Sequence, residues 1–439
     1  MKRCLIIGGG LAGLTAASIL SSKNFSVTLF ESSPKLGGRT YSFIDKGTVT
    51  EIDNGQHIMM GCYKETLSFL KLIGAENNFD YQKNLFLKFI DSHKNQYQIN
   101  ASTLFYPLNL LLSIIDYNAL SASDKLYFIL FLLKLPFISK NTIKRITVKE
   151  WLEVEGQSLN TIKSFWEILC IGALNTKLEK ASALVFYEVL IQIFFKDNSS
   201  STIILPKFGL SESLINPAER FIKKNNGQVI LSETMQEIRI ENQKVVEVKT
   251  EKNVYNYFDY VISAIPHHAF EKIICTKKIN IECKLEHELN LELKQEYSAI
   301  LNIHIWLNAD KLSEKFYGLI DSPLHWIFVK EKHINIVISD ANYLVDKSKE
   351  EIFDFVIEEL IKYTSITRKD ISQYKIIKEK RATFVPAIDT IGRRPNSKTS
   401  IKNLFLAGDW TNTGLPSTIE SAVKSGRIAA DNVVNDTLN

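Results

Sequence analysis

The first forty residues constrain the fold of this chain more than any other stretch. A short apolar run at residues 4–7 leads into a glycine-rich turn at residues 8–13, and helical periodicity continues from Leu14 to about Leu20. A second apolar run, at residues 27–30, ends in Glu31. This order of strand, turn, helix and strand predicts a βαβ unit with two parallel strands.

Each glycine of the turn meets a different steric demand. Gly8 permits a tight turn, Gly10 lets a pyrophosphate approach the backbone, and Gly13 lets the helix pack closely on the strand. The helix N-terminus offers free N–H groups to the phosphates, and Glu31 would accept hydrogen bonds from a ribose diol while repelling a 2′-phosphate. The pattern predicts dinucleotide binding, although a purely structural glycine turn has the same local sequence.

The residues after Glu31 distinguish between the nucleotides. Residues 32–40 contain Leu36-Gly37-Gly38-Arg39, which resembles the stretch that follows the ribose-binding acid in flavin amine oxidases, phytoene desaturases and protoporphyrinogen oxidases. The resemblance implies FAD rather than NAD or NADP. It also implies that the paired glycines pass close to the cofactor and that Arg39 lies along its phosphate and flavin side.

A second motif near the C-terminus has matching chemistry. The apolar run at residues 403–407 ends in Gly408 and Asp409, and a helical pattern of small and apolar residues follows Pro416, which suits a first helical turn. Asp409 can hold the ribityl or pyrophosphate region, and N–H groups at the helix start can stabilise negative charge on a reduced flavin. This motif contains no cysteine, so we expect non-covalent FAD.

The chain is too long, at 439 residues, for one compact core, and 45% hydrophobic with 23% charged residues is typical of globular proteins. We predict an α/β fold with a discontinuous, Rossmann-like, glutathione-reductase-like FAD-binding domain at residues 1–84, 203–290 and 380–439. A substrate domain of mixed sheet and helices, with an apolar helical cap, would occupy residues 85–202 and 291–379.

Periodicity and turn residues predict the elements between the motifs. Strands are expected within residues 42–55, 85–99, 203–205, 227–240, 244–258, 259–265, 297–307, 325–330, 334–339 and 378–384, and helices at residues 63–74, 104–115, 126–133, 151–195, 214–224 and 347–363.

Two of these helices, at residues 104–115 and 126–133, are apolar nearly all round, and a polar start signal at residues 121–125 separates them. Helices without a polar face are usually buried, so both are core helices of a cap in one interpretation. In the other they form a lipid-facing surface or an entrance for a very apolar substrate. We expect them to wall the substrate pocket.

Composition argues against several other classes of protein. The net charge of +4 is small, and no concentrated basic tract predicts a nucleic-acid partner. The cysteines are scattered and include no Cys-x-x-Cys pair, which is typical of reduced thiols in a cytosolic protein and not of a metal site. They are Cys4, Cys62, Cys170, Cys275 and Cys283.

Metal binding and membrane insertion are not expected. His267 and His268 are adjacent on a chain expected to be extended, where they would point to opposite faces. The first strand starts almost at once, which leaves no room for a signal peptide, and no apolar run reaches the roughly eighteen residues that a spanning helix needs. We expect a cytoplasmic protein, with or without peripheral contact at the inner face of the cytoplasmic membrane.

Further stretches make the resemblance more specific. They are Asp53-Asn54-Gly55-Gln56-His57, Ala173-Leu174-Asn175-Thr176, Leu205-Pro206-Lys207-x-Gly209-Leu210-Ser211 and the run from Leu406 to Ala422. Over nearly the whole chain they resemble the squalene-associated FAD-dependent desaturases, or hydroxysqualene dehydroxylases. The resemblance implies reductive removal of the hydroxyl of hydroxysqualene to give squalene, a step toward hopanoids or related triterpenes.

The motifs and the resemblance together define a candidate site. The resemblance implies that the backbone of Met235 holds the adenine; the alternative is that Met235 lies in an ordinary strand. The candidate general acid is His57 or Asp53, and the alternative is a structural role for both residues. Cofactor contacts are expected from Gly8, Gly10, Leu11, Ala12, Gly13, Glu31, Ser32, Gly37, Gly38, Arg39, Thr40, Gly55, Gln56, His57, Met235, Ala264, Gly408, Asp409, Pro416, Ser417, Thr418 and Ile419.

The implied partners are an apolar C30 isoprenoid and an unidentified electron donor, because no second glycine fingerprint for a nicotinamide nucleotide is visible. Two alternatives stay open. Another flavin enzyme of the same fold, such as a carotenoid desaturase or an amine oxidase, would share the cofactor motifs and differ in its pocket. A non-catalytic prenyl-binding escort protein built on this fold would carry no flavin.

Overall fold

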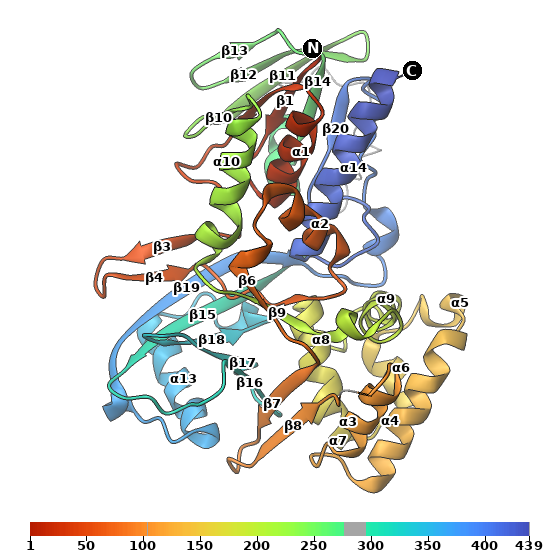
Figure 1. The fold of residues 1–439 in the computed structure, drawn as a ribbon, viewed down its shortest axis with the longest axis vertical. Coiled ribbons are helices and arrows are strands. Elements are labelled where there is room, and N and C mark those ends of the chain that lie inside the picture. The colour runs from red at the N-terminus through yellow and green to blue at the C-terminus, as the bar shows by residue number, and fades with distance from the viewer. Residues whose placement is uncertain (103, 276–295, 439) are drawn as a thin grey trace.

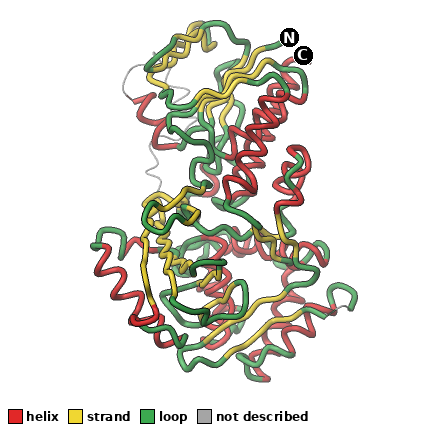
Figure 2. The backbone as a smooth tube through the Cα atoms, turned by 60° about the vertical axis from the view of Figure 1, so that its left-hand side comes forward, coloured by secondary structure: helices red, strands yellow, loops and turns green. Residues whose placement is uncertain are grey.

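The structure is a computed structural model that describes residues 1–102, 104–275 and 296–438. Cys283 and the predicted boundary between residues 290 and 291 lie outside the described residues. In Figure 1 the two termini lie together at the upper end, beside a parallel sheet, and a larger sheet with its helices fills the lower end. The backbone view of Figure 2 shows the same two parts, joined by several crossings of the chain.

The upper part is built on a five-stranded parallel sheet, which confirms the predicted βαβ start. Alternate residues of β1 face opposite sides: Cys4 and Ile6 pack under helices, whereas Leu5 and Ile7 pack against a small three-stranded sheet. In spatial order the strands are β10 (Gln228–Ile230), β2 (Ser26–Phe30), β1 (Arg3–Ile7), β14 (Tyr260–Ser263) and β20 (Leu404–Leu406), and the small sheet is β11 (Met235–Glu241), β12 (Lys244–Thr250) and β13 (Val254–Tyr255).

The helices over this sheet are α1 (Leu11–Ser22), α2 (Lys64–Ile73), α10 (Asn216–Lys224) and α14 (Ile419–Leu438). Helix α1 begins three residues earlier than expected, so Gly13 lies inside its first turn. A Cβ at Gly13 would lie 1.9 Å from the carbonyl oxygen of Gly8, which supports the predicted role of Gly13 in close packing of helix on strand. The predicted stop of α2 at Gly74 is confirmed by its left-handed conformation.

A buried carboxylate joins α14 to α2. Glu420 accepts hydrogen bonds from the backbone N–H groups of Glu65 and Thr66, both at 2.9 Å, and from the Thr66 hydroxyl at 2.6 Å. Burial raises the pKa of Glu420, and these hydrogen bonds oppose the rise. The C-terminal helix is thereby fixed to the free N–H groups at the start of α2.

We expect Glu420→Ala to lower the free energy of unfolding by about 2–4 kcal/mol, because it leaves the buried N–H and hydroxyl of Thr66 and the partly buried N–H of Glu65 without acceptors. Asp354→Ala is the matched control, since it removes a carboxylate from an exposed ion pair with Arg368 and should change stability by less than about 1 kcal/mol. Urea unfolding followed by circular dichroism measures both. An equal loss of stability in the two variants would contradict the stabilising role assigned to Glu420.

The lower part is built on a seven-stranded sheet. The strand β16 was not foreseen, and β19 begins earlier than expected and runs through residue 380, where a domain boundary was predicted. One face packs against α13 (Lys349–Tyr363) and the other against a helical group. In spatial order the strands are β19 (Ile371–Phe384), β15 (Tyr297–Leu307), β18 (Ile334–Ile338), β17 (Trp326–Val329), β16 (Phe316–Leu319), β7 (Phe86–Ile90) and β8 (Gln96–Asn100).

The prediction of continuous helix over residues 151–195 is wrong. Gly156 and Asn175 adopt left-handed conformations, with φ of 72° and 49°, and end α6 and α8. The expected Ser121 start signal is confirmed as a capping box with Asp124. The helical group is α3 (Leu108–Ile115), α4 (Ala122–Lys134), α5 (Lys140–Ile143), α6 (Val148–Val154), α7 (Leu159–Thr161), α8 (Glu167–Leu174) and α9 (Ala183–Phe194).

Short elements lie between the two parts: the hairpin β3 (Ser42–Asp45) and β4 (Thr50–Asp53), and the small sheet β5 (Met59–Met60), β9 (Ile203–Pro206) and β6 (Phe79–Tyr81). Helix α11 (His267–Cys275) packs in the core of the upper part, beside the three-stranded sheet. His267 and His268 begin this helix, so the expectation that they lie on extended chain is wrong. The described part of the chain holds no cluster of three or more metal-ligating side chains. None of its helices has the length and apolar character needed to cross a bilayer.

Candidate active site

A cavity of about 1180 Å³ extends from the parallel sheet to the seven-stranded sheet. Single small-molecule pockets usually measure roughly 300–1000 Å³, so this one has room for more than one ligand of ordinary size. One end is formed by the glycine turn, by residues 37–40 and by the start of α14. The other end is formed by α8, α9 and strands of the larger sheet.

Nearly all the predicted contact residues meet in this cavity. Gly13 and Asp53 are not among the described residues that line it. The predicted residues that do line it are Gly8, Gly10, Leu11, Ala12, Glu31, Ser32, Gly37, Gly38, Arg39, Thr40, Gly55, Gln56, His57, Met235, Ala264, Gly408, Asp409, Pro416, Ser417, Thr418 and Ile419.

Gly10 shows how closely a ligand can approach the backbone. Its φ of −74° and ψ of 179° are open to any residue, and no described atom lies within 4 Å of a Cβ placed there. Neither the backbone nor the surrounding protein therefore requires glycine, and the space in front of it belongs to the cavity. Because Gly10 caps α1, the unpaired N–H groups of the first helical turn face an anion placed in that space.

Glu31 stands beside this turn at the end of β2. One carboxylate oxygen accepts a hydrogen bond from the Gly9 N–H at 2.6 Å, and the other accepts from the Ser33 N–H at 2.8 Å. These bonds hold the carboxylate at the cavity wall, where its remaining lone pairs can accept from a ribose diol.

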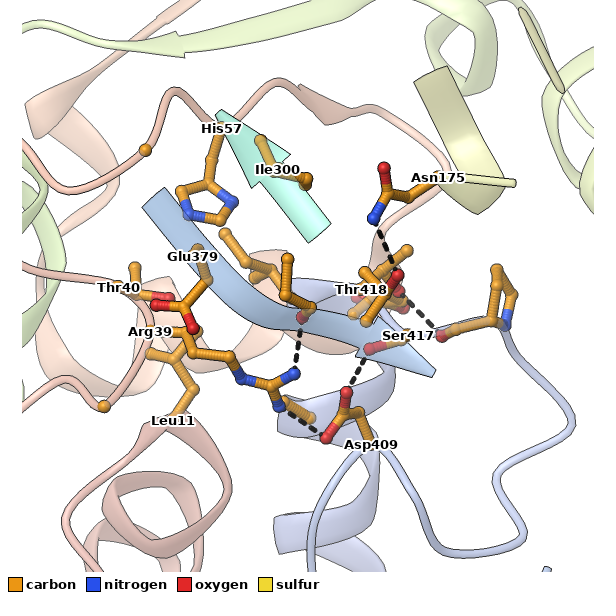
Figure 3. A pocket seen from close by; sticks show the side chains of 18 of the residues that line it. Leu11, Arg39, Thr40, His57, Asn175, Ile300, Glu379, Asp409, Ser417 and Thr418 are labelled. Carbon is orange, nitrogen blue, oxygen red and sulfur yellow. Dashed lines mark hydrogen bonds and ion pairs between the residues drawn. The ribbon is translucent and has the colours of Figure 1, made fainter. Parts of the chain in front are cut away.

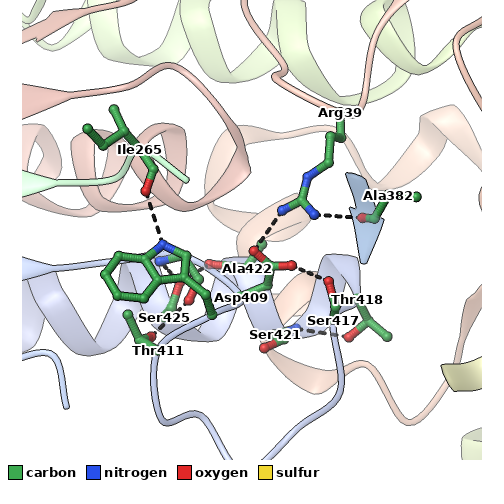
Figure 4. Close-up of polar contacts among 12 residues, drawn as sticks. Arg39, Ile265, Ala382, Asp409, Thr411, Ser417, Thr418, Ser421, Ala422 and Ser425 are labelled. Atoms are coloured by element: carbon green, nitrogen blue, oxygen red, sulfur yellow. Dashed lines mark hydrogen bonds and ion pairs between the residues drawn. The ribbon is translucent and has the colours of Figure 1, made fainter. Parts of the chain in front are cut away.

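An ion pair between Arg39 and Asp409 lies in the wall of the cavity (Figure 4). Arg39 donates to Asp409 at 2.7 Å and to the carbonyl of Ala382 at 2.6 Å, and Ser417 donates to the other oxygen of Asp409. Burial raises the pKa of Asp409, but the Arg39 charge and the hydrogen bonds from Arg39 and Ser417 together outweigh it and hold that pKa below its usual value. The pair therefore stays charged and ties together the two distant motifs and β19.

The loop that follows β4 presents His57 to the cavity. The Asn54 side chain donates to the Arg39 carbonyl at 2.8 Å, and the Gln56 N–H donates to the side-chain oxygen of Asn302 at 3.2 Å. Figure 3 shows the His57 ring directed toward β19. Burial lowers the pKa of His57 below its ordinary value of 6.5, so the ring is neutral at pH 7.

Asp53 is placed differently. Its carboxylate is buried and accepts hydrogen bonds from the Ser42 hydroxyl at 2.8 Å and from the Leu210 N–H at 2.9 Å. Of the two candidate acids, His57 is thus the one that reaches the cavity. Asp53 joins the β3–β4 hairpin to the backbone of Leu210. This contact is structural, as in the alternative interpretation of Asp53 given in the sequence analysis.

The far end of the cavity has apolar walls, and we call it the tunnel. The walls include Leu87, Phe89, Phe165, Ile168, Leu169, Val189, Ile193, Ile300, Trp326 and Phe328. The expectation that residues 104–133 wall the pocket is wrong, because none of its described residues lines the cavity. These helices belong to the same hydrophobic core as α8 and α9, and α8 and α9 form the wall instead.

Gly172 and Asn175 are two further residues of the wall that were not among the predicted site residues. Gly172 lines the tunnel, and the three atoms nearest to a Cβ there would belong to the Trp326 ring, at 3.4 Å or more. Asn175 donates to the Thr383 hydroxyl at 2.9 Å and accepts from the Asp340 N–H at 2.7 Å, which fixes α8 to the larger sheet (Figure 3). A sequence signal existed only for Asn175, since it lies in one of the motif stretches and asparagine tolerates the left-handed conformation at a helix end.

Comparison with protein families matches residues 11–434 to flavin containing amine oxidoreductase. The chain belongs to this family. It is a flavin-dependent oxidoreductase, and the cavity fits such a cofactor through the open face of Gly10, the carboxylate of Glu31 and the start of α14.

Curated relatives of this flavin oxidoreductase confirm the more specific resemblance. The chain is 30% identical to the hydroxysqualene dehydroxylase of Zymomonas mobilis, with 97% of each chain covered, and 25% identical to that of Sinorhizobium fredii, with 99% of each covered. It is 24% identical to the 15-cis-phytoene desaturase of an Oncidium hybrid cultivar, over 98% of this chain and 78% of the other.

Solved structures confirm the fold. An oxidoreductase from Methanosarcina mazei superposes with a TM-score of 0.75 at 17% identity, covering 99% of this chain and all of the other. Cyclohexylamine oxidase from Brevibacterium oxydans superposes with a TM-score of 0.71 at 13% identity, with both chains fully covered. At these identities the likeness concerns the fold alone.

Proposed function

We propose that this enzyme binds FAD non-covalently and reductively dehydroxylates hydroxysqualene to squalene, in hopanoid or related triterpene synthesis. The observation that carries the proposal is the similarity to hydroxysqualene dehydroxylases over 97% of both chains. A single cavity with a polar nucleotide end and an apolar tunnel supports it. The two-domain division predicted from the sequence is part of the same proposal, with β19 crossing between the domains.

The chain offers a group for each part of FAD. We assign the adenine to the backbone of Met235, the ribose to Glu31, and the pyrophosphate to the first turn of α1 and to Arg39. The start of α14 lines the same end of the cavity, where its free N–H groups favour negative charge on the flavin ring. Bound reduced flavin supplies the hydride for the reaction.

The apolar tunnel is matched to a long hydrocarbon. Protonation of an allylic hydroxyl lets the C–O bond break and water leave, and the carbon that loses the hydroxyl becomes part of a delocalised cation until it receives hydride. The aromatic walls at Phe89, Phe165 and Trp326 exclude water from that cation and can stabilise its charge through their ring faces. The protein thus favours hydride capture over return of water.

We assign the proton to His57. The His57→Gln variant should keep its flavin and lose about a hundredfold in turnover, which is the lower range for removal of a general acid. Turnover of hydroxysqualene, with the flavin absorption spectrum as the control for cofactor content, measures this. A variant with wild-type turnover would remove His57 from the mechanism.

The same assignment predicts a pH dependence. Because burial lowers the pKa of His57 below 6.5, the protonated form is scarce at neutral pH and becomes more abundant as the pH falls. Turnover should therefore rise toward lower pH, by about tenfold per unit while the pH exceeds the pKa. In His57→Gln this slope should be absent.

We further propose that a separate reductase or electron carrier reduces the flavin.

A further inference from the structure

The outer face of α4 carries an apolar stripe that points to solvent. Leu126, Leu130, Leu133 and Phe137 follow at intervals of four, three and four residues, so they share one face of the helix and its continuation. The three leucines are 51–56% exposed and Phe137 is 86% exposed. On the opposite face Phe128, Phe131 and Leu132 are buried. We call the four exposed residues the α4 stripe.

The α4 stripe has apolar neighbours. Ile115, at the end of α3, is 50% exposed, and the Lys125 ammonium at the start of α4 donates to its carbonyl at 2.5 Å. Phe105, just before α3, is 73% exposed. Single exposed apolar side chains are ordinary, but six of them on α4 and on the neighbouring α3 segment indicate an interaction surface. The helices labelled α3 and α4 occupy the lower right of Figure 1.

The charges around the α4 stripe are mostly positive. Residues 104–149 contain six lysines and arginines but only two aspartates and no glutamate. Lys125 flanks the stripe on α4, and Lys144 and Arg145 are exposed just beyond it, whereas Lys134 is paired with Glu155 at 2.6 Å. Each basic residue near an anionic lipid surface contributes about 1 kcal/mol to binding, whereas apolar side chains enter the headgroup boundary. Apolar residues with a basic rim therefore suit an anionic bilayer.

The same surface adjoins the wall of the cavity. Tyr106 follows the exposed Phe105 and donates a hydrogen bond from its hydroxyl to the carbonyl of Phe194, a residue that lines the cavity. The Asn109 side chain donates to that of Asn198 at 2.5 Å, just beyond the end of α9. The segment before α3 is thus fixed against the end of the helix that forms one tunnel wall.

We propose that the α4 stripe and its basic rim dock the enzyme on an anionic phospholipid bilayer, with the end of α9 facing the lipid as the entrance to the tunnel. Docking follows from the exposed residues and their charges. The assignment of the entrance rests on the proposed apolar substrate.

Flotation of the full-length flavoprotein with vesicles tests the docking without use of the enzymatic reaction. We expect binding to vesicles of phosphatidylcholine with phosphatidylglycerol, weaker binding to phosphatidylcholine alone, and release at high salt. The double variant Leu130→Ser/Leu133→Ser should partition at least about tenfold less, since each leucine contributes more than 1 kcal/mol when buried. The control Ile361→Ser removes an exposed apolar side chain from α13 and should bind as wild type.

A second variant, Lys144→Glu/Arg145→Glu, should lose binding to the anionic vesicles and keep the residual binding to phosphatidylcholine. Flavin content and circular dichroism show whether each variant is folded. The proposal is overturned if the wild type does not float with anionic vesicles or if Leu130→Ser/Leu133→Ser floats as the wild type does. It is also overturned if the wild type sediments as a dimer that this double variant converts to monomers, because a second copy would then cover the stripe.

Discussion

The Gly10→Val variant is expected to be folded, colourless and inactive. The φ and ψ of Gly10 lie in the extended region that valine prefers, and no described atom lies within 4 Å of the new Cβ, so the substitution strains neither backbone nor packing. Its methyl groups would occupy the space in which we place the pyrophosphate. We expect the affinity for FAD to fall at least about a hundredfold, which corresponds to about 2.7 kcal/mol.

The measurement is the flavin absorption spectrum of the purified variant, with circular dichroism to establish that it is folded. Ser22→Val provides a matched control, because it places the same side chain at an exposed position near the end of the same helix. This control should retain its flavin, and the flavin of the wild type should bleach with dithionite. A yellow Gly10→Val protein with unchanged affinity would show that the pyrophosphate lies elsewhere.

The Gly172→Phe variant is expected to show the opposite behaviour: a full flavin content with at least about a thousandfold lower turnover of hydroxysqualene. Gly172 lines the tunnel from α8 beside the Trp326 ring, and a benzyl group at residue 172 would take up space in the tunnel. The helix itself should tolerate the change, since phenylalanine has a higher helix propensity than glycine. A steric clash of about 4 kcal/mol is enough for a thousandfold loss of affinity.

Gly172→Ala is the control for this variant, because its Cβ would make an ordinary contact of 3.4 Å or more with the Trp326 ring. It should turn over hydroxysqualene within a few-fold of the wild type. A shorter isoprenoid allylic alcohol, which ends before the added ring, should remain a substrate of Gly172→Phe. If Gly172→Phe processes the C30 substrate normally, the hydrocarbon does not occupy this tunnel.

The nucleotide end of the cavity could be predicted from the sequence because its chemistry is local. A parallel βαβ start needs a tight turn at Gly8 and a helix packed closely at Gly13, and both demands appear as glycines at fixed spacing. The second motif was recognised for the same reason, since Asp409 follows a buried strand directly and precedes a helix. Pairing of Arg39 with Asp409 then joins two segments that are far apart in the chain.

The substrate end depends on tertiary packing, which local periodicity does not determine. Residues 104–133 are apolar enough to wall a pocket, but α8 and α9 lie in front of them. Asp53 lies four residues from His57, yet its carboxylate bonds to Ser42 and to the Leu210 backbone instead of reaching the cavity. Gly172 left no signal, because a glycine inside a helix can equally be a packing contact.

The most direct test of the proposed activity is analysis of the product by mass spectrometry. The purified flavoprotein, reduced with dithionite in the absence of oxygen, is incubated with hydroxysqualene, with phytoene and amines offered separately under oxidising conditions. We predict that hydroxysqualene is converted to squalene, with loss of its oxygen, and that phytoene and the amines are returned unchanged. Recovery of intact hydroxysqualene from the reduced enzyme, together with turnover of phytoene or an amine, would contradict the proposed function.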